Sequence, residues 1–442
     1  MLDAGVDPDE DGPAGLPDLR WLHDRSDVFL DHVIISHAHH DHVGALPVVI
    51  RQFPHVQVHM TRPTRELAEF VLPASARLQR RRVREGSSSC EPLFDEEELE
   101  LQSYLYRTHD LESEFQLTGL PGSGGVGLSF FHSGHILGAA GVELTFRENG
   151  SSRRVFYSSD TNLRSQSIIP GGVYPEGGVD VLILESTLGA DSQAELTTRR
   201  DEETRFGDAL RKAWERGGTV LVPVFAVGRA QEVLALIDRF KRRGILPASV
   251  PVYTSGAMRA VAGLYDRTRL TSPRLNRDFL VEEVDQLRLP RGRTAKSSVL
   301  NEPGIHVMSS GMMFERTLSN RIAQEIVEDE KNAVLLVGFA QDDSPAARLL
   351  AASSNGAMEG EREVVLDAAR GAQPLKCEVG RFRLSGHSHR RDLIQLVAQL
   401  SPESVVIVHG ETAAKEWMAD NIRFFYPSID VILPETGVAL EL

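Results

Sequence analysis

The sequence has few cysteines and no long apolar run. Its two cysteines, Cys90 and Cys377, lie far apart, which excludes a disulfide framework or a cysteine-rich zinc module and is typical of a reducing compartment. No run approaches the roughly 20 apolar residues that a membrane-spanning helix needs. The N-terminal MLDAGVDPDEDG is acidic and lacks the apolar core of a signal peptide. We therefore expect a soluble, intracellular protein located in the cytoplasm.

Basic residues are outnumbered by acidic ones. The chain has 48 Lys and Arg residues against 63 Asp and Glu residues, which gives a net charge of -15. This balance argues against a broad basic surface for nucleic acid, although a local groove can still be positive. The length of 442 residues predicts two or three domains.

Short β-rich runs separated by glycine and proline turns occupy much of the first 190 residues, and their spacing predicts layered sheets. They are Val33–Ile35, Val56–Met60, Gly127–Phe131, Val142–Phe146, Arg154–Ser158 and Val181–Glu185. Between them, Arg62–Leu117 is predicted to be mostly helical. From about residue 190 to 380 strands alternate with helices, as in strand Val220–Val224 and a helix from Arg229. That alternation predicts a parallel α/β sheet and a second domain.

A histidine-rich stretch, SHAHHDHVG, follows the apolar run Val33–Ile35. His37, His39, Asp41 and His42 place four donor side chains of two types within six positions. Zinc accepts imidazole and carboxylate ligands, so the loop can serve two adjacent metal ions. The alternative is a solvated turn that happens to be rich in histidine. One short loop cannot complete such a site, so the remaining ligands must come from elsewhere in the chain.

Further donors stand where predicted strands give way to loops. His135 lies in HSGHILGAAG, Asp160 ends the strand in VFYSSD, and His409 ends the strand in VVIVH. An α/β sandwich can gather such strand ends on one rim. Two metal ions roughly 3.5–4 Å apart activate hydroxide and hold a phosphate oxygen during in-line displacement.

Seven motifs, in this order, carry a family resemblance: SHAHHDHVGALP, SGHILGAAG, YSSDTN, ILESTLG, VPVFAVGRAQE, LSGHSH and VIVHGE. They resemble metallo-β-lactamase-fold nucleases of the β-CASP group, which include cleavage-and-polyadenylation-specificity-factor-like RNA-processing endonucleases and exonucleases. The resemblance implies an αββα sandwich, residues 1–190 and 381–442, with an inserted α/β β-CASP domain, residues 191–380. The first strand pair of that fold should precede LDAG, so we expect either a misassigned start or a sheet without its first strands.

The resemblance also implies roles for individual residues. One zinc ion would be bound by His37, His39 and His135, and the other by Asp41, His42 and His409. Asp160 would bridge both ions, and Asp160 and Asp41 count among the catalytic residues. Asp3, in LDAG, would orient the metal loop. His387, in LSGHSH, would protonate the leaving oxygen, and Glu185, in LEST, would orient His387.

The implied function is a zinc-dependent ribonuclease with two zinc ions, acting in RNA processing or decay. His409 favours RNA, because the DNA-repair members of the family have valine at its position. The alternatives are a non-catalytic RNA-binding scaffold and a DNA exonuclease. Family members often form homodimers, and a dimer is therefore an expectation.

Two further residues are expected to contact substrate phosphate. Arg229 would do so through its guanidinium fork, and Ser385 lies next to LSGHSH. The alternatives are an ion pair at a helix start for Arg229 and a helix N-cap for Ser385.

Overall fold

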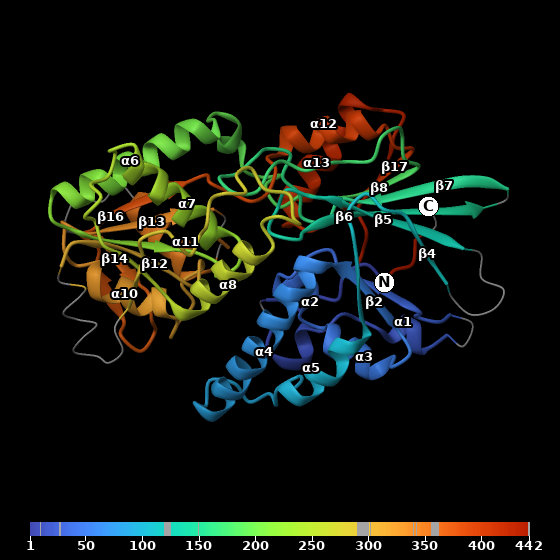
Figure 1. Ribbon diagram of the computed structural model, residues 1–442, viewed down its shortest axis with the longest axis horizontal. Helices are drawn as coiled ribbons and strands as arrows, with labels where there is room; N and C mark the ends of the chain where they lie inside the picture. The colour runs from blue at the N-terminus through green and yellow to red at the C-terminus, as the bar shows by residue number, and fades with distance from the viewer. Residues whose placement is uncertain are drawn as a thin grey trace. The chain divides into compact units, whose positions relative to one another are not determined.

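The computed structural model describes residues 1–8, 10–25, 28–118, 125–148, 150–289, 300, 302–338, 340–341, 343–354 and 362–440 (Figure 1). The chain forms two compact units. Unit 1 comprises Met1–Ser165, Ile169–Ser192 and His387–Leu442, and unit 2 comprises Gln166–Ile168 and Gln193–Gly386. Both units contain sheets and helices, which confirms the predicted α/β class.

Two sheets form the centre of unit 1. The smaller sheet has the order β1-β2-β3, and its strands run parallel. The larger has the order β18-β17-β8-β7-β6-β5-β4 and is antiparallel from β4 to β7 and parallel from β7 to β18. The strands are β1 (His32–Ile34), β2 (Gln57–Thr61), β3 (Tyr106–His109), β4 (Phe115–Leu117), β5 (Val126–His132), β6 (Ala140–Glu148), β7 (Ser151–Tyr157), β8 (Val181–Glu185), β17 (Ser404–Val408) and β18 (Asp430–Ile432).

Helices cover the outer face of each sheet. Those beside the smaller sheet are α1 (Arg20–His23), α2 (His40–Val43), α3 (Leu46–Gln52), α4 (Arg62–Arg84) and α5 (Glu96–Gln102), and those beside the larger are α12 (Arg390–Leu400) and α13 (Thr412–Phe425). Within unit 1, Figure 1 shows the sheets between these two groups of helices. The segment predicted to be mostly helical, Arg62–Leu117, forms α4 and α5 but ends in β3 and β4.

Three apolar clusters hold the four layers of unit 1 together. One joins the smaller sheet to its helices and includes Val58 of β2 and Leu72 of α4. A second lies between the sheets and includes Ile34 and Phe130. A third joins the larger sheet to α12 and α13 and includes Leu184. Neighbouring side chains of one strand therefore serve different cores, as Val33 and Ile34 of β1 do, which is expected of a layered α/β unit.

Unit 2 is built on a parallel sheet with the order β11-β10-β12-β9-β13-β16. Its elements are α6 (Arg199–Glu215), β9 (Thr219–Pro223), α7 (Arg229–Arg242), β10 (Val252–Thr254), α8 (Gly256–Arg267), β11 (Leu287–Arg288), β12 (Gly304–Met308), α10 (Leu318–Ile326), β13 (Ala333–Val337), α11 (Pro345–Ser354), β14 (Glu363–Val365), β15 (Ala372–Pro374) and β16 (Glu378–Phe382). Strands β9 and β13 are buried at every position, which fits their unbroken apolar sequences.

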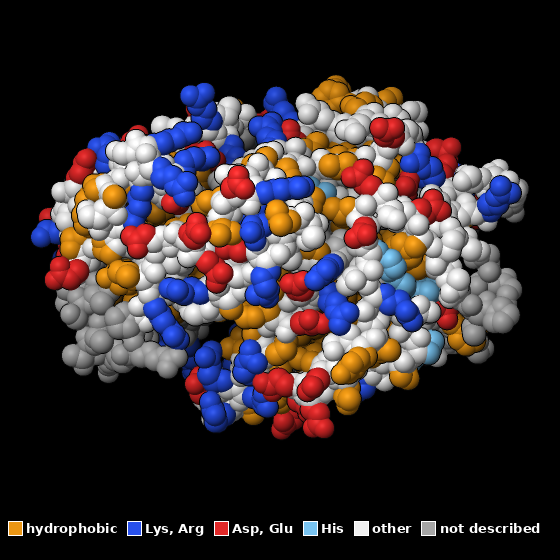
Figure 2. Space-filling view, in the orientation of Figure 1, with side chains coloured by type: hydrophobic (Ala, Val, Ile, Leu, Met, Phe, Trp, Pro, Cys, Tyr) orange, Lys and Arg blue, Asp and Glu red, His pale blue; other side chains and the backbone are white. Residues whose placement is uncertain are grey.

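Acidic and basic side chains are interspersed among the described residues on the face shown in Figure 2. Among the described residues, no helix combines the length and apolarity that a bilayer crossing requires.

A row of three histidines crosses the smaller sheet of unit 1. His32 Nδ1 lies 3.0 Å from His59 Nε2, and His59 Nδ1 lies 2.9 Å from His109 Nε2. At the other end, His32 Nε2 lies 3.2 Å from the carbonyl oxygen of Thr118. Since that carbonyl only accepts, His32 Nε2 donates to it, and each following ring then donates in the same direction. The row is therefore complete with three neutral rings.

The histidine row predicts a loss of stability in acid. Burial lowers the pKa of all three rings, and with the neighbouring charges it brings the pKa of His59 to about 3. Because the pKa of His59 is lower in the folded state than in the unfolded chain, the unfolded chain binds more protons in acid. The contribution of neutral His59 to the free energy of unfolding is therefore present at neutral pH and is lost as pH falls from about 6.5 towards 3. One proton changes the free energy of unfolding by at most about 1.4 kcal/mol per pH unit.

Urea unfolding at pH 7.5 and pH 5 measures this effect. The free energy of unfolding should fall less between the two pH values in His59→Gln than in the wild type. His55→Gln, at an exposed position just before β2, is the control and should behave like the wild type. Equal acid sensitivity of His59→Gln and wild type would show that the row does not sense pH.

Candidate metal centre

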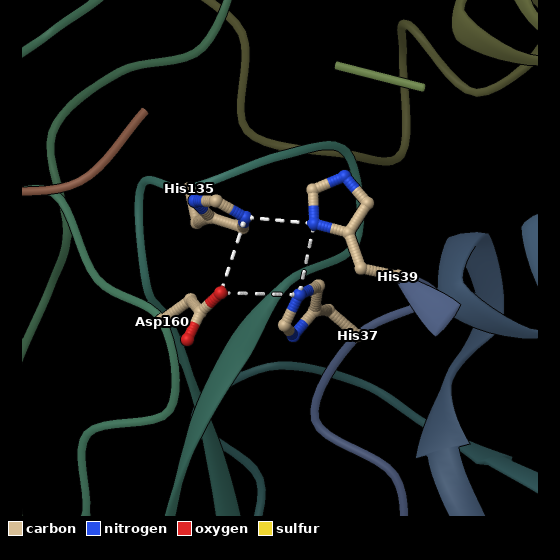
Figure 3. Close-up of side chains that lie close together, drawn as sticks. All are labelled: His37, His39, His135 and Asp160. Atoms are coloured by element: carbon tan, nitrogen blue, oxygen red, sulfur yellow. Dashed lines mark hydrogen bonds and ion pairs between the residues drawn. The ribbon is translucent and has the colours of Figure 1, made fainter. Parts of the chain in front are cut away.

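The histidine-rich loop lies between β1 and α2, at one rim of unit 1. His37 is fully buried, and His39 is the N-cap residue of α2. His135 comes from the loop after β5, and Asp160 from the loop after β7. Figure 3 shows the four side chains pointing toward one another. Segments far apart in sequence therefore bring four donors to one point.

The spacing of these four donors suits a single metal ion. His39 Nδ1 lies 3.2 Å from His37 Nε2 and 3.1 Å from His135 Nε2. Asp160 Oδ2 lies 3.5 Å from both His37 Nε2 and His135 Nε2. Ligands about 2.0–2.1 Å from a tetrahedral zinc ion lie about 3.3 Å from one another. The residues present therefore fit zinc.

A second group of donors adjoins the first. Asp41 Oδ2 lies 3.4 Å from His409 Nε2 and 3.9 Å from His42 Nε2. These three residues form a compact set of candidate metal ligands. His409 follows β17, at the same rim as Asp160.

Asp160 faces both groups with different oxygens. Its Oδ2 atom faces His37 and His135, whereas its Oδ1 atom lies 3.4 Å from His42 Nε2 and 3.4 Å from His409 Nδ1. Only 2% of Asp160 is exposed. A buried carboxylate placed in this way can serve two ions at once, as two-metal sites require.

The carboxylates of the site favour positive charge on the histidines beside them. Burial opposes charge on His42, yet Asp160, Asp3 and Asp41 hold its pKa well above the usual range. Burial likewise opposes charge on His409, but Asp160 and Asp41 raise its pKa to about 9. The carboxylates thus favour positive charge at this point, which a bound metal ion would supply to neutral, ligating imidazoles.

Asp3 orients one of the candidate ligands, His42, through a network of hydrogen bonds. Its Oδ2 atom accepts hydrogen bonds from His42 Nδ1 at 2.7 Å, Ser36 Oγ at 2.7 Å and Tyr157 Oη at 2.8 Å. Its Oδ1 atom accepts from the backbone N–H of Ser36 at 2.7 Å. Asp3 thus holds Nδ1 of His42 and leaves Nε2 facing the site, which is how carboxylates orient metal-binding histidines.

Strained backbone surrounds the centre. Asp3, Ser159 and His409 have φ angles of 57°, 53° and 49°, in the left-handed region that residues other than glycine rarely adopt. Such conformations persist only where surrounding contacts hold them, and they cluster at functional sites. All three residues lie at or beside candidate metal ligands.

Replacing Asp3 should weaken zinc binding without removing a ligand. Asn tolerates the left-handed conformation, but it lacks the charge that holds His42. We expect Asp3→Asn to bind zinc about 10–100-fold more weakly, as measured by competition with a chelating dye. Tyr157→Phe removes one hydrogen bond from the same oxygen and should have a smaller effect. Unchanged zinc affinity in Asp3→Asn would contradict the role of Asp3.

Glu185 and His387 form a pair beside the metal ligands. His387 Nδ1 lies 3.0 Å from Glu185 Oε2, and its Nε2 lies 4.0 Å from Asp160 Oδ2. Burial lowers the pKa of His387, but the charges of Glu185 and Asp160 outweigh burial, so that its pKa is raised. His387 can therefore carry a proton on the nitrogen that faces the centre.

Hydroxyl groups and a backbone amide fix this pair, and sequence reasoning did not single them out. Glu185 Oε1 accepts from the backbone N–H of Thr161 at 2.6 Å, and Oε2 accepts from Thr187 Oγ1 at 2.5 Å. Thr187 Oγ1 also lies 2.9 Å from His409 Nδ1. The signal in the sequence is that Thr161 follows Asp160 and Thr187 lies two residues after Glu185.

The remaining loop histidine and the two predicted substrate contacts are not among the candidate ligands. His40 turns toward Ser75 of α4, with its Nε2 atom 3.4 Å from Ser75 Oγ. Helix α12 begins at Arg390 with His389 as its N-cap residue, so Ser385 does not cap it. Arg229 is the first residue of α7, and its Nη2 atom donates to Gln166 Oε1 at 3.1 Å. Arg229 and Ser385 belong to unit 2, and their contact with substrate stays a prediction.

Three family models match successive parts of the chain. Residues 1–147 match the metallo-β-lactamase superfamily, residues 230–349 the β-CASP domain, and residues 372–434 the Zn-dependent metallo-hydrolase RNA specificity domain. The match from residue 1 and the inserted β-CASP domain confirm the predicted fold and family resemblance. The prediction about strands before Met1 stays a prediction.

Curated relatives are similar over nearly the whole chain. Integrator complex subunit 11 of Danio rerio is 26% identical, over 99% of this chain and 69% of that protein. An RNase J-like protein of Methanocaldococcus jannaschii is 26% identical, over 98% and 93%. Endoribonuclease YSH1 of Kluyveromyces lactis is 25% identical, over 93% of this chain but only 52% of its own length.

Among solved structures, a protein of unknown function from Enterococcus faecalis V583 has a TM-score of 0.52 at 14% identity. The alignment covers 99% of this chain and 93% of that one. At this identity the likeness supports the fold alone.

Proposed function

We propose that this chain, a metallo-β-lactamase superfamily protein with a β-CASP domain and an RNA specificity domain, is a ribonuclease that uses two zinc ions. The observation that carries the proposal is the convergence of seven donors in two groups, both of which face Asp160, beside the Glu185–His387 pair. The RNA specificity domain and the ribonucleases among the relatives support RNA as the substrate.

The seven donors are assigned to two ions. His37, His39, His135 and Asp160 would hold one ion, and Asp41, His42, His409 and Asp160 the other. Bound zinc supplies a water of lowered pKa as the nucleophile and a positive charge for a phosphate oxygen. Because Asp160 reaches both groups, it fixes their separation, and Asp3 fixes the ring of His42.

His387 is assigned the role of general acid. Glu185 holds its Nδ1 atom, so Nε2 is the atom that carries a proton toward the leaving oxygen. Thr161 and Thr187 keep Glu185 in place. A positioned acid of this kind contributes roughly 10²–10⁴-fold to a rate.

Cleavage of end-labelled RNA by the zinc-loaded full chain tests the function. We expect RNA to be cut, a chelator to stop the reaction and added zinc to restore it, whereas DNA of the same sequence stays intact. The length of the products distinguishes internal cutting from trimming at an end. If the zinc-loaded chain leaves RNA whole, the catalytic assignment fails in favour of an RNA-binding scaffold. Cleavage of DNA alone would favour a DNA exonuclease.

A further inference from the structure

Two arginines stand at one edge of the unit 2 sheet, each at the start of a helix. Helix α6 starts at Arg199 and precedes β9, and α7 starts at Arg229 and follows β9. Because the strands are parallel, both helices begin at the carboxyl edge of the sheet. Open parallel sheets bind their ligands at this edge. The segment after β16 reaches the same place, since Arg199 Nη1 donates to the carbonyl oxygen of Ser385 at 3.5 Å.

Electrostatic repulsion opposes the placement of Arg199 and Arg229 at these helix N-termini. A helix N-terminus carries partial positive charge and stabilises anions, not cations. The two arginines also repel each other. Burial, and next the charge of Arg199, lower the pKa of Arg229 to about 10. Glu202 and Glu232 lie in the first turns of the same helices and offset part of this positive charge.

The guanidinium groups are only partly satisfied. Arg229 is 8% exposed, and its Nη2 atom donates to Gln166 Oε1, but its buried Nη1 atom has no hydrogen-bond partner among the described residues. Arg199 donates from Nε to Glu203 Oε1 at 3.1 Å, while its buried Nη2 atom likewise has no partner in the described part of the chain. A buried donor without a partner is costly, and each one calls for an explanation.

The carboxylates beside the two arginines are shared with other groups. Glu203, which pairs with Arg199, also accepts from Arg239 of α7. Glu232 accepts from the backbone N–H groups of Ser167 and Ile168. Both carboxylates are thus engaged elsewhere as well.

We propose that Arg199 and Arg229 form a phosphate-binding subsite in unit 2 that uses none of the candidate metal ligands. Guanidinium forks match the oxygens of a phosphate group, and the two helix N-termini add to the attraction. Arg199 keeps 17% of its side chain exposed, so a ligand can reach it from solvent. The source of the phosphate is RNA, through a backbone phosphate or a 5′-terminal one. This last step rests on the proposed function, whereas binding of phosphate itself does not.

Inorganic phosphate is the probe for the subsite, measured by calorimetry on the zinc-loaded full chain. Arg199→Met and Arg229→Met should weaken the Arg-dependent phosphate binding about tenfold or more, as expected for lost charge-assisted hydrogen bonds. Arg229→Lys keeps the charge without the fork and should be intermediate. Arg242→Met is the control, because Arg242 lies in α7 with its side chain 68% exposed. The metal centre is common to all variants, so differences among them report on the arginines.

RNA kinetics identify the source of the phosphate and separate this proposal from the proposed function. The arginine variants should raise KM more than they lower kcat. A larger rise for 5′-monophosphorylated RNA than for 5′-hydroxyl RNA assigns the subsite to the terminal phosphate, and an equal rise assigns it to the backbone. If the chain binds phosphate through the arginines but cuts no RNA, only the proposed function fails. Lower thermal stability of the variants with unchanged phosphate affinity would overturn the subsite and leave a structural role.

Discussion

Asp160→Asn should abolish RNA cleavage and reduce the zinc content of the protein below two ions per chain. The two oxygens of Asp160 face the two groups of donors, and Asn removes the charge while keeping the shape. Several kcal/mol of transition-state stabilisation depends on the metal pair, so we expect the cleavage rate to fall about 10³-fold or more. Metal analysis by mass spectrometry and single-turnover cleavage measure the two effects together.

The fold should survive this change. Asp160 lies in a loop after β7 and is not part of the apolar clusters. Circular dichroism and thermal melting of metal-free protein provide the check. Asp420→Asn, at a position 81% exposed in α13, is the matched control and should keep full activity and zinc content. Two bound zinc ions and undiminished cleavage in Asp160→Asn would refute the bridging role.

His387→Ala should separate catalysis from metal binding. Loss of a positioned general acid lowers the rate roughly 10²–10⁴-fold, whereas the seven assigned ligands remain. We therefore expect a large fall in kcat with unchanged zinc content and little change in KM. A substrate with a leaving oxygen that needs no proton should recover much of the rate, which a merely structural defect would not allow.

His389→Ala is the control for His387→Ala. His389 lies two residues further on and pairs with Asp392, with 3.2 Å between Nε2 and Oδ2, and it should keep most of the activity. If both variants lose activity equally, the effect belongs to the loop and not to the proton carried by His387. If His387→Ala loses zinc, the residue is a metal ligand and not the assigned acid.

Local patterns were sufficient to predict several elements. The alternation of apolar strands and amphipathic segments predicted a parallel sheet between residues 190 and 380, and α7 begins at Arg229 as expected. The end of Arg62–Leu117 was harder to predict. Tyr106–His109 and Phe115–Leu117 are short strands whose pairing partners, β2 and β5, lie elsewhere in the chain. Whether such a short segment forms a strand depends on its pairing with a neighbouring strand and not on local propensity.

The histidine row and the arginine pair also could not be predicted from local sequence patterns. Nothing near His59 in sequence indicates that His32 and His109 flank it, because register between neighbouring strands places the three rings. Arg199 and Arg229 lie thirty positions apart, and they become neighbours only when two helices start at one edge of a sheet.

The sequence by itself determined which donors are available and where they occur along the chain. His37, His39, Asp41 and His42 share one loop, so a short stretch predicts four ligands. The tertiary structure decided how these donors combine. It brought His135, Asp160 and His409 to the loop from three strand ends, turned the two oxygens of Asp160 toward different groups, and placed Asp3 behind His42. The physical reason is that a metal site needs atoms about 3–4 Å apart, and sheet topology sets such distances between residues that are remote in sequence.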